Sequence, residues 1–134
     1  MTTPNVLFVC LHGSAKSLIA AEHFRRLAAE RGVKMTAMSA GTEADSEVPP
    51  KVVQGLLAEG IDVRVRRPHQ VTRTDVTTAS HVVTFACDLG DMAPAGMALE
   101  RWDDVPAVSE DFTKARDVIV ARVSRLLEGC AKSA

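Results

Sequence analysis

Short apolar runs alternate with longer amphipathic stretches along this chain. Val6-Leu7-Phe8-Val9 is the first such run, and further runs occupy 33–40, 81–86 and 98–102. Apolar runs bounded by turn residues favour buried strands, whereas apolar residues that recur every three or four positions favour helices. The second pattern predicts helices from Leu18 towards Gly32, from Pro49-Pro50 to Gly60, over 74–80 and over 111–128.

The order of these elements predicts an α/β fold. A strand, a loop, a helix and a second strand make a βαβ unit, whose crossover is right-handed and whose strands are parallel. Residues 88–98 are expected to form a helical turn or loop, and Gly129 is expected to end the last helix. A chain of 134 residues with 46% hydrophobic side chains can bury one core, so a single domain over 1–134 is expected.

The loop after the first apolar run has the composition of an anion site. Its sequence is Cys10-Leu11-His12-Gly13-Ser14-Ala15-Lys16-Ser17. Backbone N–H groups at a helix N-terminus lack intrahelical partners and attract anions, and small residues such as Gly13 let a loop curl around one. The field that holds an oxyanion also stabilises a thiolate, so Cys10 is predicted to be a nucleophile under a tetrahedral oxyanion. The alternative is a buried and inert cysteine at the end of a strand.

The loop resembles the signature of the low-molecular-weight protein tyrosine phosphatases and of the arsenate reductases that share their fold. In that signature five residues separate the cysteine from an Arg-Ser pair, and here Lys16-Ser17 stands in its place. An ammonium is a point charge, whereas a guanidinium grips two oxygens at once. Gly13 also stands where the family usually has Asn. Supporting similarities occur at Ser39-Ala40-Gly41-Thr42, at 57–62 and at 82–85.

The resemblance implies a three-layer α/β/α fold with a four-stranded parallel sheet, phosphotyrosine phosphatase I-like. It implies that Cys10 attacks a phosphomonoester to form a phosphocysteine and that Lys16 helps to hold the oxyanion. The other loop residues would bind substrate: Leu11, His12, Gly13, Ser14, Ala15 and Ser17. The family's general acid is an Asp followed by Pro after the last strand. Asp104, separated from Pro106 by Val105, is the favoured match, and Asp103 is the alternative.

Three other functions stay open. Arsenate reduction would use the same thiolate and an external thiol that takes over the arsenic. A catalytically weakened relic of the fold would bind phosphate, sulfate or arsenate without turnover, and Lys16 and Gly13 favour this interpretation. A redox-sensing protein would pair Cys10 with Cys87, which also closes an apolar run and should lie at the same sheet edge. The expected partners are therefore an oxyanion and either a phosphoprotein or a small thiol donor.

The composition of the chain bears on its expected partners and on its location in the cell. The formal net charge is −1, which provides no broad basic field for nucleic acid or an anionic membrane. No apolar run approaches the roughly 20 residues of a membrane span, and the N-terminus lacks a signal-peptide pattern, so a cytoplasmic location is expected. Three cysteines make no disulfide framework. No metal or cofactor is expected.

Two further features have competing interpretations. Arg64, Arg66 and Arg67 form either a solvated charged segment or a basic rim beside the anion site. The chain has one Trp and no Tyr, so an aromatic wall for a substrate ring would come from Trp102 or a Phe. Trp102 is equally suited to be a core residue.

Overall fold

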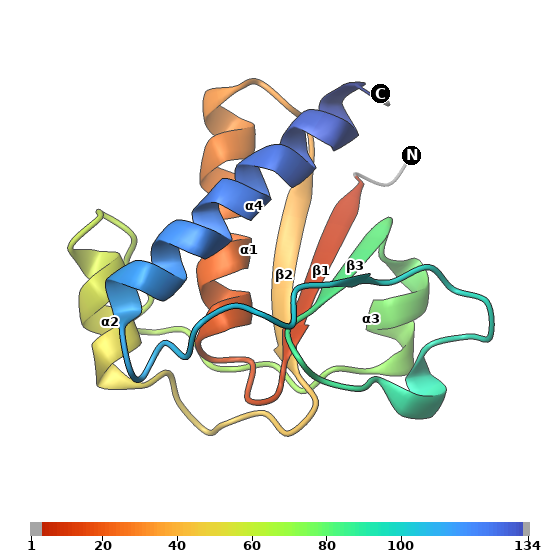
Figure 1. Ribbon diagram of the computed structural model, residues 1–134, viewed down its shortest axis with the longest axis horizontal. Helices are drawn as coiled ribbons and strands as arrows, with labels where there is room; N and C mark the ends of the chain where they lie inside the picture. Colours follow the sequence, from red (N-terminus) through yellow and green to blue (C-terminus); the bar gives the residue numbers. More distant parts are fainter. Residues whose placement is uncertain (1–3, 133–134) are drawn as a thin grey trace.

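The structure, a computed structural model, describes residues 4–132. Its elements are, in chain order, β1 (Asn5–Cys10), α1 (Lys16–Glu30), β2 (Thr36–Gly41), α2 (Pro50–Leu57), α3 (Arg73–Thr78), β3 (His81–Thr84), the 3₁₀ turn η1 (Gly90–Met92), β4 (Glu100–Arg101) and α4 (Phe112–Lys132) (Figure 1). None of the helices in this part of the chain is long and apolar enough to cross a membrane.

Four parallel strands form one sheet in the order β2-β1-β3-β4. β1 occupies an interior position because its residues from Val6 to Cys10 are all buried, as a parallel strand covered on both faces requires. Cys10 pairs with Gly41 at the end of the ladder between β1 and β2, so the loops that follow these strands meet at one edge of the sheet. The predicted four-stranded parallel α/β fold is confirmed.

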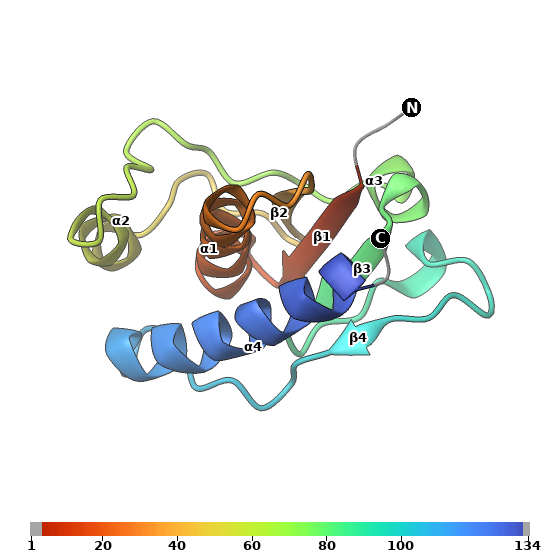
Figure 2. The same ribbon diagram turned by 90° about the horizontal axis from the view of Figure 1, so that it is seen from above.

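Helices cover both faces of the sheet, as the two views together show (Figures 1 and 2). α1 and α4 pack on one face, where Phe8, Phe24 and Ile119 belong to the larger core cluster. Leu7 points to the other face and packs in a second cluster with Val76 of α3. This alternation along β1 follows from the two-residue period of a strand. α2 lies beyond α1, away from the sheet (Figure 1).

The ends of several elements differ from the sequence-based expectation. α4 continues through Gly129 to Lys132, so the prediction that this glycine ends the helix is wrong; a glycine inside a helix costs only about 1 kcal/mol. β3 stops at Thr84, because Ala86 adopts a left-handed φ of 52° that turns the chain out of the ladder. β4 keeps only two of the residues predicted for it.

Candidate active site at the end of β1

The thiol of Cys10 lies at the base of the loop between β1 and α1. The residue is buried, with 7% of its surface exposed. Gly13 donates its backbone N–H to Cys10 Sγ at 3.2 Å, and Ser17 Oγ lies 3.0 Å from the same sulfur. Hydrogen bonds donated to a sulfur stabilise it more strongly when it is charged, so these two groups suit a thiolate.

The loop also presents backbone N–H groups that have no protein acceptor. Within residues 4–132, no group accepts a hydrogen bond from the backbone N–H of His12, Ser14, Ala15, Lys16 or Ser17. These groups lie at or before the start of α1, a helix of 15 residues whose dipole adds positive potential at this end. Free N–H groups at a helix start can hold a tetrahedral oxyanion.

Lys16 is the first residue of α1 and is partly buried. In the described part of the chain its ammonium makes no hydrogen bond and no ion pair, so the cation is available to a bound anion. The structure therefore brings the predicted nucleophile, the predicted cation and the free N–H groups together on one short segment.

β2 and the segment after it fix the shape of this loop. The backbone N–H groups of Thr42, Glu43 and Asp45 donate to the carbonyls of Cys10, Leu11 and His12, respectively, at 2.8–3.2 Å. Leu11 is 43% exposed, and His12 Nδ1 lies 3.2 Å from the carbonyl oxygen of Glu43. The side chain of His12 thus faces the neighbouring segment, and its contribution to anion binding would come from its backbone.

Two polar residues to which the sequence analysis gave no role at the site, Ser39 and Asp45, support the loop. Ser39 Oγ lies 2.8 Å from Ser17 Oγ and donates to the Gly13 carbonyl at 3.3 Å. Ser14 Oγ, which is buried, donates to Asp45 Oδ2 at 2.8 Å. Parallel strands bring their carboxyl ends to the same edge of a sheet, so the end of β2 is expected beside the end of β1. This rule could have pointed to Ser39, which pairs in register with Phe8.

The hydroxyls of Ser17 and Ser39 form a chain that responds to the charge on Cys10. Each hydroxyl has one proton to donate. While Ser39 donates to the Gly13 carbonyl, Ser17 must donate to Ser39 and the Cys10 thiol donates to Ser17. Once the thiol is ionised, the Ser17 hydroxyl is the group that can turn its proton to the sulfur. Ser39 thus holds the partner of the nucleophile in place.

The two candidate acids, Asp103 and Asp104, face different partners. Both carboxylate oxygens of Asp104 accept hydrogen bonds from the Arg122 guanidinium, at 2.7 and 2.8 Å, and this pairing holds the pKa of Asp104 below its usual value. Asp103 Oδ1 instead accepts the backbone N–H of Ala86 at 2.9 Å, at the turn after β3. The favoured match, Asp104, is therefore directed to α4, whereas the alternative, Asp103, is held at the turn after β3.

Cys87 lies near both Cys10 and Asp103. Its Sγ donates to the carbonyl of Val9 at 3.4 Å. Burial raises the pKa of the Cys87 thiol, and the neighbouring Cys10 and Asp103 act in the same direction. Cys87 is thus held in its thiol form beside the loop. Residues 4–132 contain no cluster of three or more His, Cys, Asp or Glu side chains that could hold a metal.

The structure resolves the two competing interpretations made from the sequence. Arg66 and Arg67 line a cavity of about 200 Å³ together with Gly13 and Ser39, so part of the basic segment borders the loop. Arg64 is exposed and pairs with Asp62 instead. Trp102 is 5% exposed, and its ring lies 5.8 Å from that of Phe8 and 5.5 Å from that of Phe85, so it is a core residue.

Comparison with known families agrees with this site. A family model described as low molecular weight phosphotyrosine protein phosphatase matches residues 5–104, a range that includes the loop and both candidate acids. The chain belongs to this family. As a low molecular weight phosphotyrosine phosphatase relative, it carries the family loop with Lys16 as its cation. The resemblance predicted from the loop is confirmed.

Solved structures similar to this family member include YfkJ and two arsenate reductases. YfkJ from Bacillus subtilis is 25% identical with a TM-score of 0.84, and the match covers 99% of this chain and 98% of that one. A thioredoxin-dependent arsenate reductase from Corynebacterium glutamicum is 25% identical with a TM-score of 0.82; the match covers 98% of this chain, which spans 64% of the length of that one.

A third structure is described as an arsenate reductase in the phosphate binding state. It is 21% identical to this chain with a TM-score of 0.79, covering 94% of this chain and 98% of that one, a likeness that shows the fold alone. No curated protein matches the sequence. The family is named for an enzyme activity, so the comparisons place the chain in a family of enzymes.

Proposed function

We propose that this chain is a cysteine-dependent phosphomonoester hydrolase that acts through a phosphocysteine. The observation that carries the proposal is a buried thiol flanked by donors next to backbone N–H groups without protein acceptors. Phosphoryl transfer needs both parts, because the sulfur forms the new bond while fixed N–H groups and a cation hold the phosphoryl oxygens. The family match and the phosphate binding state of an arsenate reductase with the same fold support the assignment.

The reaction has two steps. The Cys10 thiolate attacks phosphorus in line, forming an S–P bond and breaking the bond to the leaving oxygen, which takes a proton from Asp103. Water then attacks the phosphocysteine, gives a proton to Asp103, and releases phosphate and the thiolate. We assign the proton to Asp103 because Arg122 keeps Asp104 ionised. Such an acid contributes about a hundred- to ten-thousand-fold in rate.

Arsenate reduction is the second candidate, and it is favoured by Cys87, whose Sγ donates to the carbonyl of Val9, the residue before Cys10. The same thiolate would attack As(V), with loss of water. Reduction to As(III) takes two electrons, which come from the oxidation of two thiols to a disulfide. An external small thiol or Cys87 would provide the second thiol. The expected cytoplasmic location suits either reaction, because Cys10, Cys87 and Cys130 are all free thiols, which a reducing compartment preserves.

Turnover of p-nitrophenyl phosphate at mildly acidic pH, run beside arsenate reduction with a thiol donor, tests the proposal. Wild type should hydrolyse the phosphate ester, and acid-quenched protein should carry a phosphoryl group on Cys10. Cys10→Ser should lose turnover while still binding inorganic phosphate, which serves as its control for folding. Reduction of arsenate alone would assign the chain to the reductases. Silence in both assays with phosphate binding intact would make it a non-catalytic anion-binding protein.

A further inference from the structure

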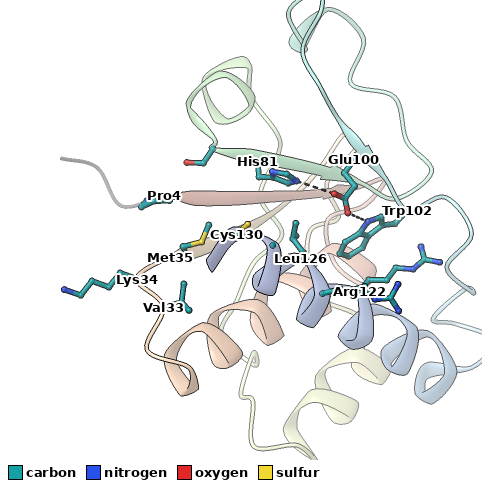
Figure 3. Close-up of a pocket in the computed structure, with 13 residues that line it drawn as sticks. Pro4, Val33, Lys34, Met35, His81, Glu100, Trp102, Arg122, Leu126 and Cys130 are labelled. Atoms are coloured by element: carbon teal, nitrogen blue, oxygen red, sulfur yellow. Dashed lines mark hydrogen bonds and ion pairs between the residues drawn. The ribbon is translucent and has the colours of Figure 1, made fainter. Parts of the chain in front are cut away.

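A second cavity lies at the opposite end of the sheet from Cys10. It has a volume of about 970 Å³ and lies between α4, the segment that joins α1 to β2, and the starts of β3 and β4 (Figure 3). Pro4, which precedes β1, and His81, the first residue of β3, mark this end of the sheet. Sites for small molecules usually measure about 300–1,000 Å³. The cavity is therefore large enough for an organic ligand.

One side of the cavity is a stripe of α4 beside the face that the core buries fully, and its member Leu126 is partly buried against that core. Arg122, Arg125, Leu126 and Cys130 recur at intervals of three and four, so they share a helix face. The fully buried face of α4 consists of other residues, namely Ala115, Ile119, Val123 and Leu127. Figure 3 shows Leu126 and Cys130 facing the side formed by His81 and Glu100. The cavity thus has an apolar surface that no other element of residues 4–132 covers.

Further apolar atoms come from the chain between α1 and β2 and from Trp102. Val33 and Met35 are partly buried and line the cavity on the side away from Glu100 (Figure 3). The indole Nε1–H of Trp102 donates to Glu100 Oε2 at 2.6 Å. Trp102, which is 5% exposed, also lines the cavity.

The charged groups around the cavity leave an excess of positive charge. Arg122 is paired with Asp104, and His81 Nε2 lies 3.4 Å from Glu100 Oε1. Lys34 and Arg125 have no ion pair and no hydrogen bond among residues 4–132. Lys34 points away from the other labelled side chains in Figure 3. Arg125 precedes Leu126 on α4 and lines the cavity, so it is the free cation on the α4 side.

We propose that this cavity binds a small organic acid with an aromatic or branched apolar body. Arg125 pairs with the acid group, and Leu126, Met35 and the ring of Trp102 pack against the body. A bare phosphate would leave the apolar surface uncovered, and an organic cation would meet unpaired Arg125. The site is separate from the loop at Cys10 and does not depend on the function proposed for it.

The test uses Trp102, which is the only Trp of the chain and borders the cavity. The full chain is titrated with 8-anilinonaphthalene-1-sulfonate and with its uncharged analogue N-phenyl-1-naphthylamine, and energy transfer from Trp102 is measured. We expect the sulfonate to bind about ten-fold more tightly than the analogue, because a charge-assisted bond is worth at least that factor. Arg125→Ala should remove this preference. Arg73→Ala, at an exposed arginine of α3, should keep it.

Equal affinity for the two probes would overturn the proposal, and so would an equal loss of affinity for the sulfonate in Arg125→Ala and Arg73→Ala. Displacement of the sulfonate by inorganic phosphate would place the probe at the loop and would also overturn it. A signal that grows as urea unfolds the chain would assign binding to a partly unfolded state and also count against it. Cys10→Ser should bind the probe like wild type, so loss of phosphatase activity and loss of this site remain distinguishable.

Discussion

Gly13 and Gly41 lie backbone against backbone beside Cys10. A Cβ on Gly13 would lie 2.6 Å from the Gly41 nitrogen, and one on Gly41 would lie 2.5 Å from the Gly13 nitrogen. Side chains do not approach backbone atoms this closely, so both positions need glycine. Gly13 also has a φ of 63°, which residues with a Cβ rarely adopt. The contact holds the loop against β2 and so keeps Ser39 within reach of Ser17.

Replacing Gly13 should therefore cost more than its φ angle alone explains. Gly32 is a matched control, because its φ is 67° and a Cβ there would meet nothing within 4 Å. We expect Gly13→Ala to lower the free energy of unfolding by about 1–3 kcal/mol more than Gly32→Ala, the usual cost of forcing extra atoms into a packed site. Urea denaturation measures both. Equal losses would show that the loop can move away from β2 at no cost.

We expect Lys16 to strengthen the binding of an oxyanion by the loop. Lys16→Arg should raise the rate of aryl phosphate hydrolysis by about ten-fold, since a guanidinium donates two parallel hydrogen bonds and a charge-assisted bond is worth roughly 1.5–3 kcal/mol. Lys16→Ala should lower the rate by a similar factor. Lys114→Arg, at an exposed position of α4, is the control for an added guanidinium. A Lys16→Ala enzyme as fast as wild type would exclude this lysine from the reaction.

Replacing Asp103 by Asn should affect kcat much more than replacing Asp104 by Asn. Asp103→Asn should lower kcat for phosphate esters with poor leaving groups by about a hundred-fold or more, because it removes the proposed proton donor. Asp104→Asn should leave kcat near the wild-type value. If Asp104→Asn alone slows turnover, Asp104 is the acid despite its pairing with Arg122.

Asp104→Asn should instead change how stability depends on pH. The pKa of Asp104 is lower in the folded chain than its usual value near 4, so the unfolded chain binds the proton more readily. The pair with Arg122 thus stabilises the fold above about pH 4 and loses its effect as pH falls below that value. Urea denaturation between pH 3 and pH 7 should show a smaller acid loss in Asp104→Asn than in wild type.

The parts of the site that depend on neighbours in sequence were predictable, and those that depend on distant contacts were not. Local sequence determines the strand, the loop and the start of the helix around Cys10. An apolar run precedes this cysteine and small residues follow it, and both patterns can be recognised without knowledge of distant contacts. The choice between two adjacent carboxylates depends on Arg122, which reaches Asp104 only after α4 has packed on the sheet. The contact of Ser39 with Ser17 likewise depends on the register between β1 and β2.

His23 should make the fold less stable in mild acid. It is 3% exposed on α1, and its Nε2 lies 3.5 Å from Glu59 Oε2 without forming a hydrogen bond. Burial lowers the pKa of His23, and the nearby Glu59 carboxylate only partly opposes this. Because the unfolded chain takes up the proton near pH 6.5, the free energy of unfolding should fall below that pH until the folded-state pKa is passed.

The expected slope is at most about 1.4 kcal/mol per pH unit, the value for one proton. Urea denaturation at pH 7.5, 6.5 and 5.5 should show this slope in wild type. The control His69→Gln, which changes a half-exposed histidine beside Asp75, should show the same slope. His23→Gln should flatten it, because an amide takes up no proton over this range. A wild-type slope retained in His23→Gln would assign the acid sensitivity to another group.

Arg116 also holds Glu59, so Arg116→Gln should reduce the slope by freeing that carboxylate to pair with protonated His23.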